Sequence, residues 1–139
     1  HYTEVFDRLL AKGELKATKE VSRKVAYHDP CYLGRHNGVY EQPRNVLDHI
    51  PGLTRIELPR NRENSLCCGG GGGGLWADMP QDERFAVLRV QEAMEAGADT
   101  IATACPYCTS MLEDAVKVLF LEDHLQIMDV AELLAESVE

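Results

Sequence analysis

The 139 residues include 23 Asp and Glu against 14 Lys and Arg, so the formal net charge is −9 at neutral pH. With 45% hydrophobic residues, a chain of this length can bury the core of one domain without disulfide staples. The negative charge argues against a nucleic-acid partner, whose groove needs clustered Lys and Arg, and no apolar run approaches the ~18–20 residues of a membrane span.

The N-terminus has neither the basic start nor the apolar run of a secretory signal. We therefore expect a cytoplasmic location with reduced thiols, where clustered cysteines indicate metal or redox chemistry more often than disulfides. Because the chain begins with His1 rather than Met, we also expect it to be an excised or processed piece of a longer polypeptide.

Hydrophobic periodicity predicts the elements of the first half of the chain, in the order helix 1–12, strand 25–27, helix 40–50 and strand 54–58. We expect the first helix to direct Val5, Leu9 and Leu10 inward. Apolar spacing then predicts, in order, helix 82–96, strand 99–104, a helix from residue 106, strand 125–128 and helix 130–137. Phe85, Leu88 and Val90 are expected to face the core from helix 82–96.

Strands that alternate with helices indicate parallel pairing through right-handed crossovers. The predicted fold class is therefore α/β, a layered domain with a mainly parallel four-stranded sheet flanked by helices. We expect a single domain over residues 1–139, in which an N-terminal helix and connector (1–24) precede the core (25–139).

The five cysteines follow the predicted strands. Cys31 comes after the first strand, the Cys67–Cys68 pair after the second, and Cys105 and Cys108 after the third. Ligands of parallel sheets bind beyond the carboxyl ends of the strands, so we expect all five thiols at one edge of the sheet.

Four kinds of site are compatible with this pattern. A disulfide framework would leave one cysteine unpaired, and a single tetrahedral zinc needs only four ligands. A dithiol redox site would use Cys105 and Cys108, whose tetrapeptide with Pro106 and Tyr107 resembles the active site of glutaredoxins. It would leave the other three cysteines without a role.

An iron–sulfur cluster would use all five cysteines, because adjacent thiolates can ligate different irons. Six consecutive glycines, 69–74, follow Cys68. Without a Cβ, the backbone amides from Gly69 and Gly70 onward could approach the cluster closely and donate hydrogen bonds to it. We therefore favour the cluster.

Thirty-five residues separate Cys31 from Cys67 and 36 separate Cys68 from Cys105, before a final Cys-x-x-Cys. With the surrounding segments 28–35, 37–40, 60–64 and 103–108, this pattern resembles the cysteine-rich CCG domain of the heterodisulfide reductase and glycolate oxidase iron–sulfur subunit family. The resemblance extends over about residues 25–136.

The resemblance implies an oxidoreductase and a 4Fe-4S cluster, of an unusual non-cubane type in heterodisulfide reductase. Its ligands would be Cys31, Cys67, Cys68, Cys105 and Cys108. Zinc could occupy the site of a recombinant protein as a substitute, and an excised domain could lack metal altogether.

The resemblance also implies a longer parent subunit with ferredoxin-like clusters, of which this chain would be the C-terminal copy of the domain. Electrons would pass between the cluster and a disulfide, a quinone or a flavoprotein partner, and the parent complex could place the domain at the cytoplasmic face of the membrane. We expect the isolated domain to be inactive alone.

Two features allow more than one interpretation. His28, three residues before Cys31, could donate a hydrogen bond or a proton at the cluster, or could simply fix the turn at Asp29 and Pro30. The alternative function is a non-catalytic docking domain with zinc or no metal, or a dithiol module that uses Cys105 and Cys108.

Overall fold

The computed structural model describes residues 1–138 and contains one four-stranded sheet. All neighbouring strands are parallel, which confirms the predicted α/β class. The strand order is β2-β1-β3-β4, with strands β1 (Lys24–Tyr27), β2 (Thr54–Ile56), β3 (Thr100–Thr103) and β4 (Gln126–Asp129). The small-residue strand β3 lies centrally, and all four of its residues are buried.

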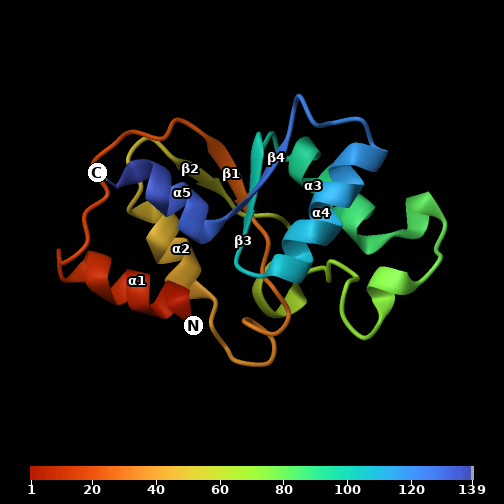
Figure 1. Ribbon diagram of the computed structural model, residues 1–139, viewed down its shortest axis with the longest axis horizontal. Helices are drawn as coiled ribbons and strands as arrows, with labels where there is room; N and C mark the ends of the chain where they lie inside the picture. The colour runs from red at the N-terminus through yellow and green to blue at the C-terminus, as the bar shows by residue number, and fades with distance from the viewer. Residues whose placement is uncertain (139) are drawn as a thin grey trace.

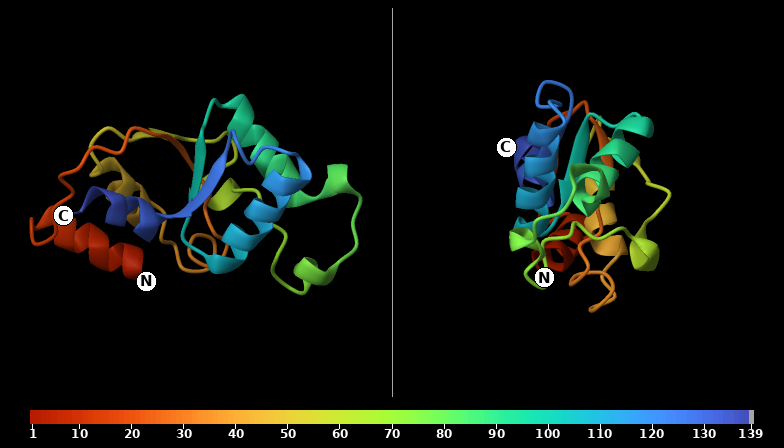
Figure 2. Two further views of the ribbon diagram at one scale, coloured as in Figure 1. Left: turned by 45° about the horizontal axis from the view of Figure 1, so that its top comes forward. Right: turned by 90° about the vertical axis from the view of Figure 1, so that its right-hand side faces the viewer.

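Five α-helices cover the two faces of this sheet (Figure 1). On one side lie α1 (Tyr2–Ala11), α2 (Glu41–Asp48) and α5 (Val130–Ser137), and on the other lie α3 (Phe85–Glu95) and α4 (Pro106–Val118). Short 3-10 turns occur at Arg62–Asn64, Gly74–Trp76 and Gln81–Glu83. All three belong to the long segment between β2 and α3, and the part of this segment with the last two turns extends beyond α3 and α4 (Figure 2).

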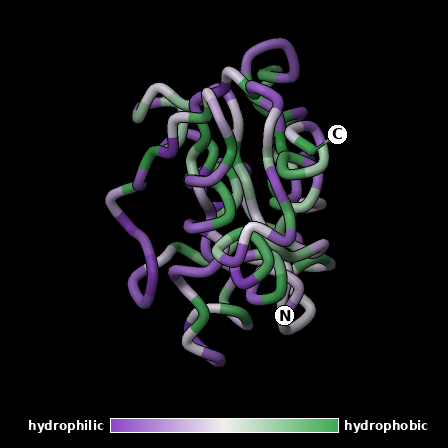
Figure 3. The backbone as a smooth tube through the Cα atoms, turned by 90° about the vertical axis from the view of Figure 1, so that its left-hand side faces the viewer, coloured by the Kyte–Doolittle hydropathy of each residue, from purple (hydrophilic) through white to green (hydrophobic). Residues whose placement is uncertain are grey.

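Each face of the sheet carries its own hydrophobic cluster. Alternate residues of β1 point to opposite faces, so Ala26 packs with the α3 and α4 side while Val25 and Tyr27 pack with α1, α2 and α5. Hydrophobic residues gather along the strands and the facing sides of the helices, whereas the outlying loops are largely hydrophilic (Figure 3). Among the described residues, none of the helices is long and apolar enough to cross a membrane.

Most of the predicted elements have limits in the structure that differ by one to three residues, and helix 82–96 and strand 54–58 are two examples. The predicted helix 82–96 is too long, because 81–83 form a 3-10 turn and Arg84 is extended, so that α3 begins at Phe85. The strand predicted over 54–58 ends at Ile56.

Two of the predicted inward side chains also face outward. Val5 and Phe85 are both more than two-fifths exposed. On α3 the predicted Val90 is buried, and the buried face also includes Ala86 and Arg89, so a charged residue occupies a position that periodicity assigns to the core.

Candidate metal centre

The candidate site lies at the switch point of the sheet, between the neighbouring strands β1 and β3. The chain leaves β1 for β2 on one side and reaches β3 on the other, and the crevice beyond such a switch point is where open α/β sheets bind ligands. His28 follows β1 directly, and Cys105 lies two residues beyond β3. The backbone N–H of His28 donates to the carbonyl oxygen of Ala102 at 2.8 Å, which joins the two loops at their base.

Asp29 anchors the loop that carries Cys31. Its two carboxylate oxygens accept from Nη1 and Nη2 of Arg44, at 2.7 and 2.8 Å. The backbone N–H of Arg62 also donates to this carboxylate at 2.8 Å, and the Ser65 hydroxyl donates to the Asp29 carbonyl oxygen at 3.3 Å. Asp29 therefore fixes the first cysteine loop to the segment that leads into Cys67 and Cys68, and Arg44 rather than His28 holds the turn.

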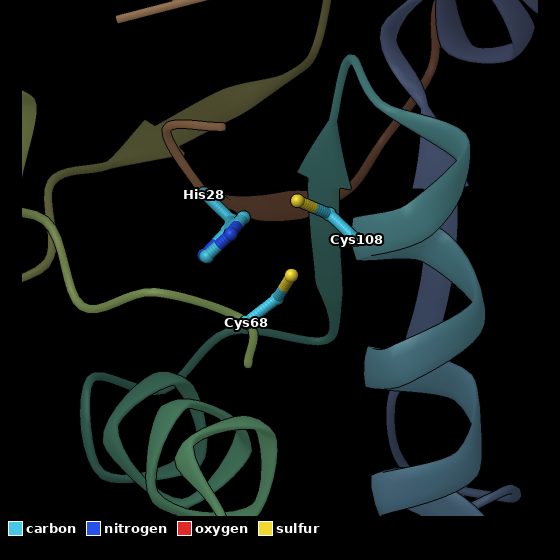
Figure 4. A group of neighbouring side chains, drawn as sticks. All are labelled: His28, Cys68 and Cys108. Carbon is cyan, nitrogen blue, oxygen red and sulfur yellow. The ribbon is translucent and has the colours of Figure 1, made fainter. Parts of the chain in front are cut away.

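Three buried side chains from three segments converge beyond the sheet. A ring nitrogen of His28 and the Sγ atoms of Cys68 and Cys108 lie within 4.8 Å of one another. Figure 4 shows the three side chains directed toward a common space, His28 from the end of β1, Cys68 from its loop and Cys108 from the start of α4. Sulfur and imidazole nitrogen are the donors that soft and borderline transition metals prefer.

The other thiols surround the same region unequally. A cavity of about 570 Å³ is lined by Cys31, Cys68, Cys105 and Cys108, together with glycines 70–73 and the exposed Trp76. Cys67 instead lines an adjoining cavity of about 510 Å³, which it shares with Cys68. All five cysteines are free thiols.

Glycine brings backbone donors up to the sulfur atoms. The N–H groups of Gly69 and Gly70 donate to the Sγ atoms of Cys67 and Cys68, at 3.3 and 3.5 Å. Gly69 has a φ of 83°, which favours glycine, and a Cβ on Gly74 would lie 2.0 Å from the carbonyl oxygen of Gly69. Glycine is therefore favoured at position 69 by the backbone and required at position 74 by the close approach of the Gly69 carbonyl oxygen.

The start of α4 activates one thiol. Cys105 is the N-cap residue and Pro106 occupies the first turn, where a missing N–H costs nothing. A hydrogen bond from the Cys108 thiol and others from the N–H groups of Cys108 and Tyr107 lower the pKa of Cys105 to about 6.

The two buried thiols, Cys68 and Cys108, share a hydrogen bond in which Cys108 keeps its proton. Donation from Cys108 holds the pKa of Cys68 well below its ordinary value, whereas hydrogen bonds to Cys105 and Cys68 raise the pKa of Cys108. Burial raises the pKa of Cys67 and lowers that of His28.

The chemistry of these residues fits an iron–sulfur cluster. Two sulfur atoms already accept backbone N–H groups, which is how proteins stabilise the charge on cluster sulfurs. The buried Nε2 of His28 has no hydrogen-bond partner among residues 1–138, so a polar group is available in the same region.

Sequence reasoning missed two buried arginines. Arg44 and Arg89 are almost completely buried, and Arg89 donates from Nε to Nδ1 of His28 at 3.1 Å. A charged residue on an apolar helix face was the available signal for Arg89, since it lies three residues after Ala86 and four before Ala93.

Fold and side chains together define a cysteine-rich α/β domain with its thiols at the switch point of a parallel sheet. The family model described as "Cysteine-rich domain" (CCG) matches residues 25–113. The chain belongs to this family.

Curated relatives are similar over almost the whole chain. It is 41% identical to a probable iron–sulfur-binding oxidoreductase, FadF, of Bacillus subtilis, over 99% of this chain and 20% of the relative. It is 41% identical to an EtfAB:quinone oxidoreductase of Syntrophomonas wolfei, over 100% of this chain and 20% of the relative. It is 40% identical to one subunit of the dihydromethanophenazine:CoB–CoM heterodisulfide reductase of Methanosarcina barkeri, over 99% of this chain and 33% of the relative. The chain thus spans a fifth to a third of the length of these proteins, which are oxidoreductases or their subunits.

Proposed function

We propose that this chain is an iron–sulfur electron-transfer domain of a heterodisulfide-reductase-like oxidoreductase. The observation that carries the proposal is the convergence of thiols from three loops on one region at the carboxyl edge of the sheet. The printed names of the relatives support it, because they include an iron–sulfur-binding oxidoreductase and a heterodisulfide reductase component.

In this proposal a 4Fe-4S cluster, of the non-cubane type, is held by Cys31, Cys67, Cys68, Cys105 and Cys108. Such a cluster accepts and releases single electrons at a potential set by its protein surroundings. The buried sulfurs of Cys68 and Cys108 exclude water from their side of the site. The N–H groups of Gly69 and Gly70 offset negative charge on the sulfur atoms that they contact.

The wider role also belongs to the proposal. Since the relatives are three to five times longer than this chain, its partners would include further domains of a parent subunit with ferredoxin-like clusters. A flavoprotein, a quinone-reactive membrane subunit or a disulfide would complete the electron path. The quinone named for one relative supports an association with a membrane, and the domain would lie at its cytoplasmic face. The isolated domain would be inactive alone.

A dithiol function is the second candidate, and one observation favours it. Cys105 at the N-terminus of α4 has a pKa of about 6, and Cys108 retains its proton beside it. An attacking thiolate and a protonated neighbour are what a Cys-x-x-Cys redox site needs. This function would leave Cys31, Cys67 and Cys68 without a role.

Anaerobic reconstitution with iron and sulfide distinguishes the two functions. We expect about four irons per chain, the count of a 4Fe-4S cluster, with charge-transfer absorption and a paramagnetic resonance signal that changes when a thiol ligand is added. Cys68→Ser should abolish the cluster, while Ser110→Ala, an exposed change on the same helix as Cys108, should not alter it. Uptake of one zinc and no iron, or an unchanged spectrum of Cys68→Ser, would contradict the proposal.

A further inference from the structure

A series of hydrogen-bonded side chains leads from Arg60 at the surface, through Glu92 and Arg89, to His28 beside the thiols. Nε of Arg89 donates to Nδ1 of His28 at 3.1 Å, and Nη1 of Arg89 donates to Glu92 at 2.6 Å and to the Arg60 carbonyl oxygen at 2.7 Å. Glu92 also accepts from the guanidinium of Arg60 at 3.1 Å. His28 and Arg89 are fully buried, whereas the Arg60 side chain is about half exposed.

The contact with Arg89 determines which nitrogen of His28 carries the proton. A guanidinium has only donors, so Nδ1 must offer its lone pair to Arg89. In a neutral imidazole the proton then resides on Nε2. Glu92 compensates the buried charge of Arg89, which allows the guanidinium to stay protonated against the histidine.

This arrangement leaves His28 without a lone pair for a metal. Nδ1 is occupied by Arg89 and Nε2 is protonated, although His28 shares the 4.8 Å group with Cys68 and Cys108. Nε2–H is buried and has no acceptor among the described residues. In a cluster the neighbouring cysteine sulfurs are thiolates. Their negative charge makes them suitable acceptors for the buried Nε2–H of His28.

We propose that Arg89 is a positioning residue that fixes His28 as the Nε2–H tautomer, so that His28 serves the cluster as a hydrogen-bond donor and not as a ligand. The part that concerns the cluster rests on the proposed function, whereas the tautomer does not. Because hydrogen bonds to cluster sulfurs stabilise the reduced, more negative state, His28 sets the reduction potential without adding to the ligand count.

Nitrogen NMR of the metal-free, reduced protein with labelled histidine tests the tautomer. We expect the Nε2–H form of His28, assigned by the loss of its signals in His28→Gln, to exceed the Nδ1–H form at least about tenfold, since a hydrogen bond to a charged donor outweighs the corresponding ~1.4 kcal/mol. Arg89→Met should shift the population toward Nδ1–H. Arg60→Ala keeps the carbonyl that Arg89 contacts and should change nothing. A wild-type protein in the Nδ1–H form would overturn the inference, whatever the variants do.

Reconstitution tests the consequence for the cluster. His28→Leu should bind as much iron as the wild type but show a more negative reduction potential, and His28→Gln, whose amide can still donate, should shift less. Loss of an iron or of the paramagnetic signal in His28→Leu would show that His28 is a ligand and overturn the proposal. If the wild type itself takes up no iron, the proposed function fails while the NMR result still decides the tautomer.

Discussion

At the scale of single residues, the loop after β1 is held by a buried ion pair. Asp29 and Arg44 are each only about 1–2% exposed, and Arg44 also donates to the partly exposed Glu57. The guanidinium carbon of Arg44 lies 4.9 Å from the centre of the Tyr27 ring, a cation–π distance. Loss of one partner leaves the other charge buried, so this pair matters more than the exposed pairs of the surface.

We predict that Arg44→Met lowers the free energy of unfolding by about 3–5 kcal/mol, because Asp29 then lies buried without a counter-charge. Arg55→Met is the control. Arg55 pairs with Asp48, whose side chain is 48% exposed, and its loss should cost about 1 kcal/mol or less. Urea unfolding followed by circular dichroism measures both, and equal losses would show that the Asp29 pair has no special weight.

The thiols should also differ in reactivity. In the metal-free protein the lowered pKa of Cys105, about 6, means that its thiolate is present above pH 6 and is lost as the pH falls through that value. Cys67 is similarly half-buried, but burial raises its pKa. We predict that iodoacetamide at pH 7 modifies Cys105 much faster than Cys67, as measured by peptide mass spectrometry over a pH series. A rate at Cys105 that rises only above pH 8 would contradict this assignment.

At the scale of elements, the segment between β2 and α3 depends on backbone contacts that side chains would block. Gly69, Gly72 and Gly73 all have positive φ, and the first N–H groups of the run contact sulfur. Its geometry is therefore determined by what glycine permits rather than by apolar packing. Trp76, at the end of the run, is 87% exposed and does not pack against the sheet.

Two alanine substitutions within the glycine run should differ in their effect on the free energy of unfolding. A Cβ on Gly74 would lie 2.0 Å from the Gly69 carbonyl oxygen, so Gly74→Ala must displace backbone, and we expect a loss of about 1–3 kcal/mol in unfolding free energy. A Cβ on Gly71 meets nothing within 4 Å and needs no positive φ, so Gly71→Ala should be neutral within about 0.5 kcal/mol. Denaturant unfolding of the metal-free proteins measures the difference, and an equal effect of both would refute the backbone contact.

At the scale of the whole molecule, one thin sheet joins two hydrophobic clusters. Leu47 belongs to the cluster beneath α1, α2 and α5, and Leu112 to the cluster beneath α3 and α4. The N-terminal helix takes part in the same unit, because the Tyr2 hydroxyl donates at 2.5 Å to Asp129, the N-cap of α5. Since β1 and β3 contribute to both clusters, neither face can lose its packing alone.

We therefore predict a single unfolding transition that both faces control. Leu47→Ala and Leu112→Ala each remove a fully buried side chain and should lower the unfolding free energy by about 2–5 kcal/mol while the transition stays single. Val5→Ala, at a side chain that is 42% exposed, serves as the control and should change it by less than about 1 kcal/mol. In each variant, hydrogen exchange of the β1 and β3 amides should change in the same direction. A variant in which the packing of only one face is lost would disprove the coupling.

The sequence alone was sufficient for the alternation of strands and helices, the parallel sheet and the placement of the cysteines after strands. Each of these depends on local apolar spacing or on the cysteine pattern, and both can be identified without knowing which residues are in contact in the fold. The predicted helix 82–96 is too long at its start, because residues 82–84 are all charged and give no apolar spacing that marks where the helix begins, and the backbone of Arg84 is extended.

Only the tertiary structure decided the roles of the buried arginines and of His28. Periodicity predicts burial from apolarity, and an arginine can be buried only when carboxylates or other acceptors reach it from elsewhere in the chain. Arg44 meets Asp29 across 15 positions and Arg89 meets His28 across 61. Those long-range contacts determine both the turn that carries Cys31 and the tautomer of the histidine beside Cys68 and Cys108.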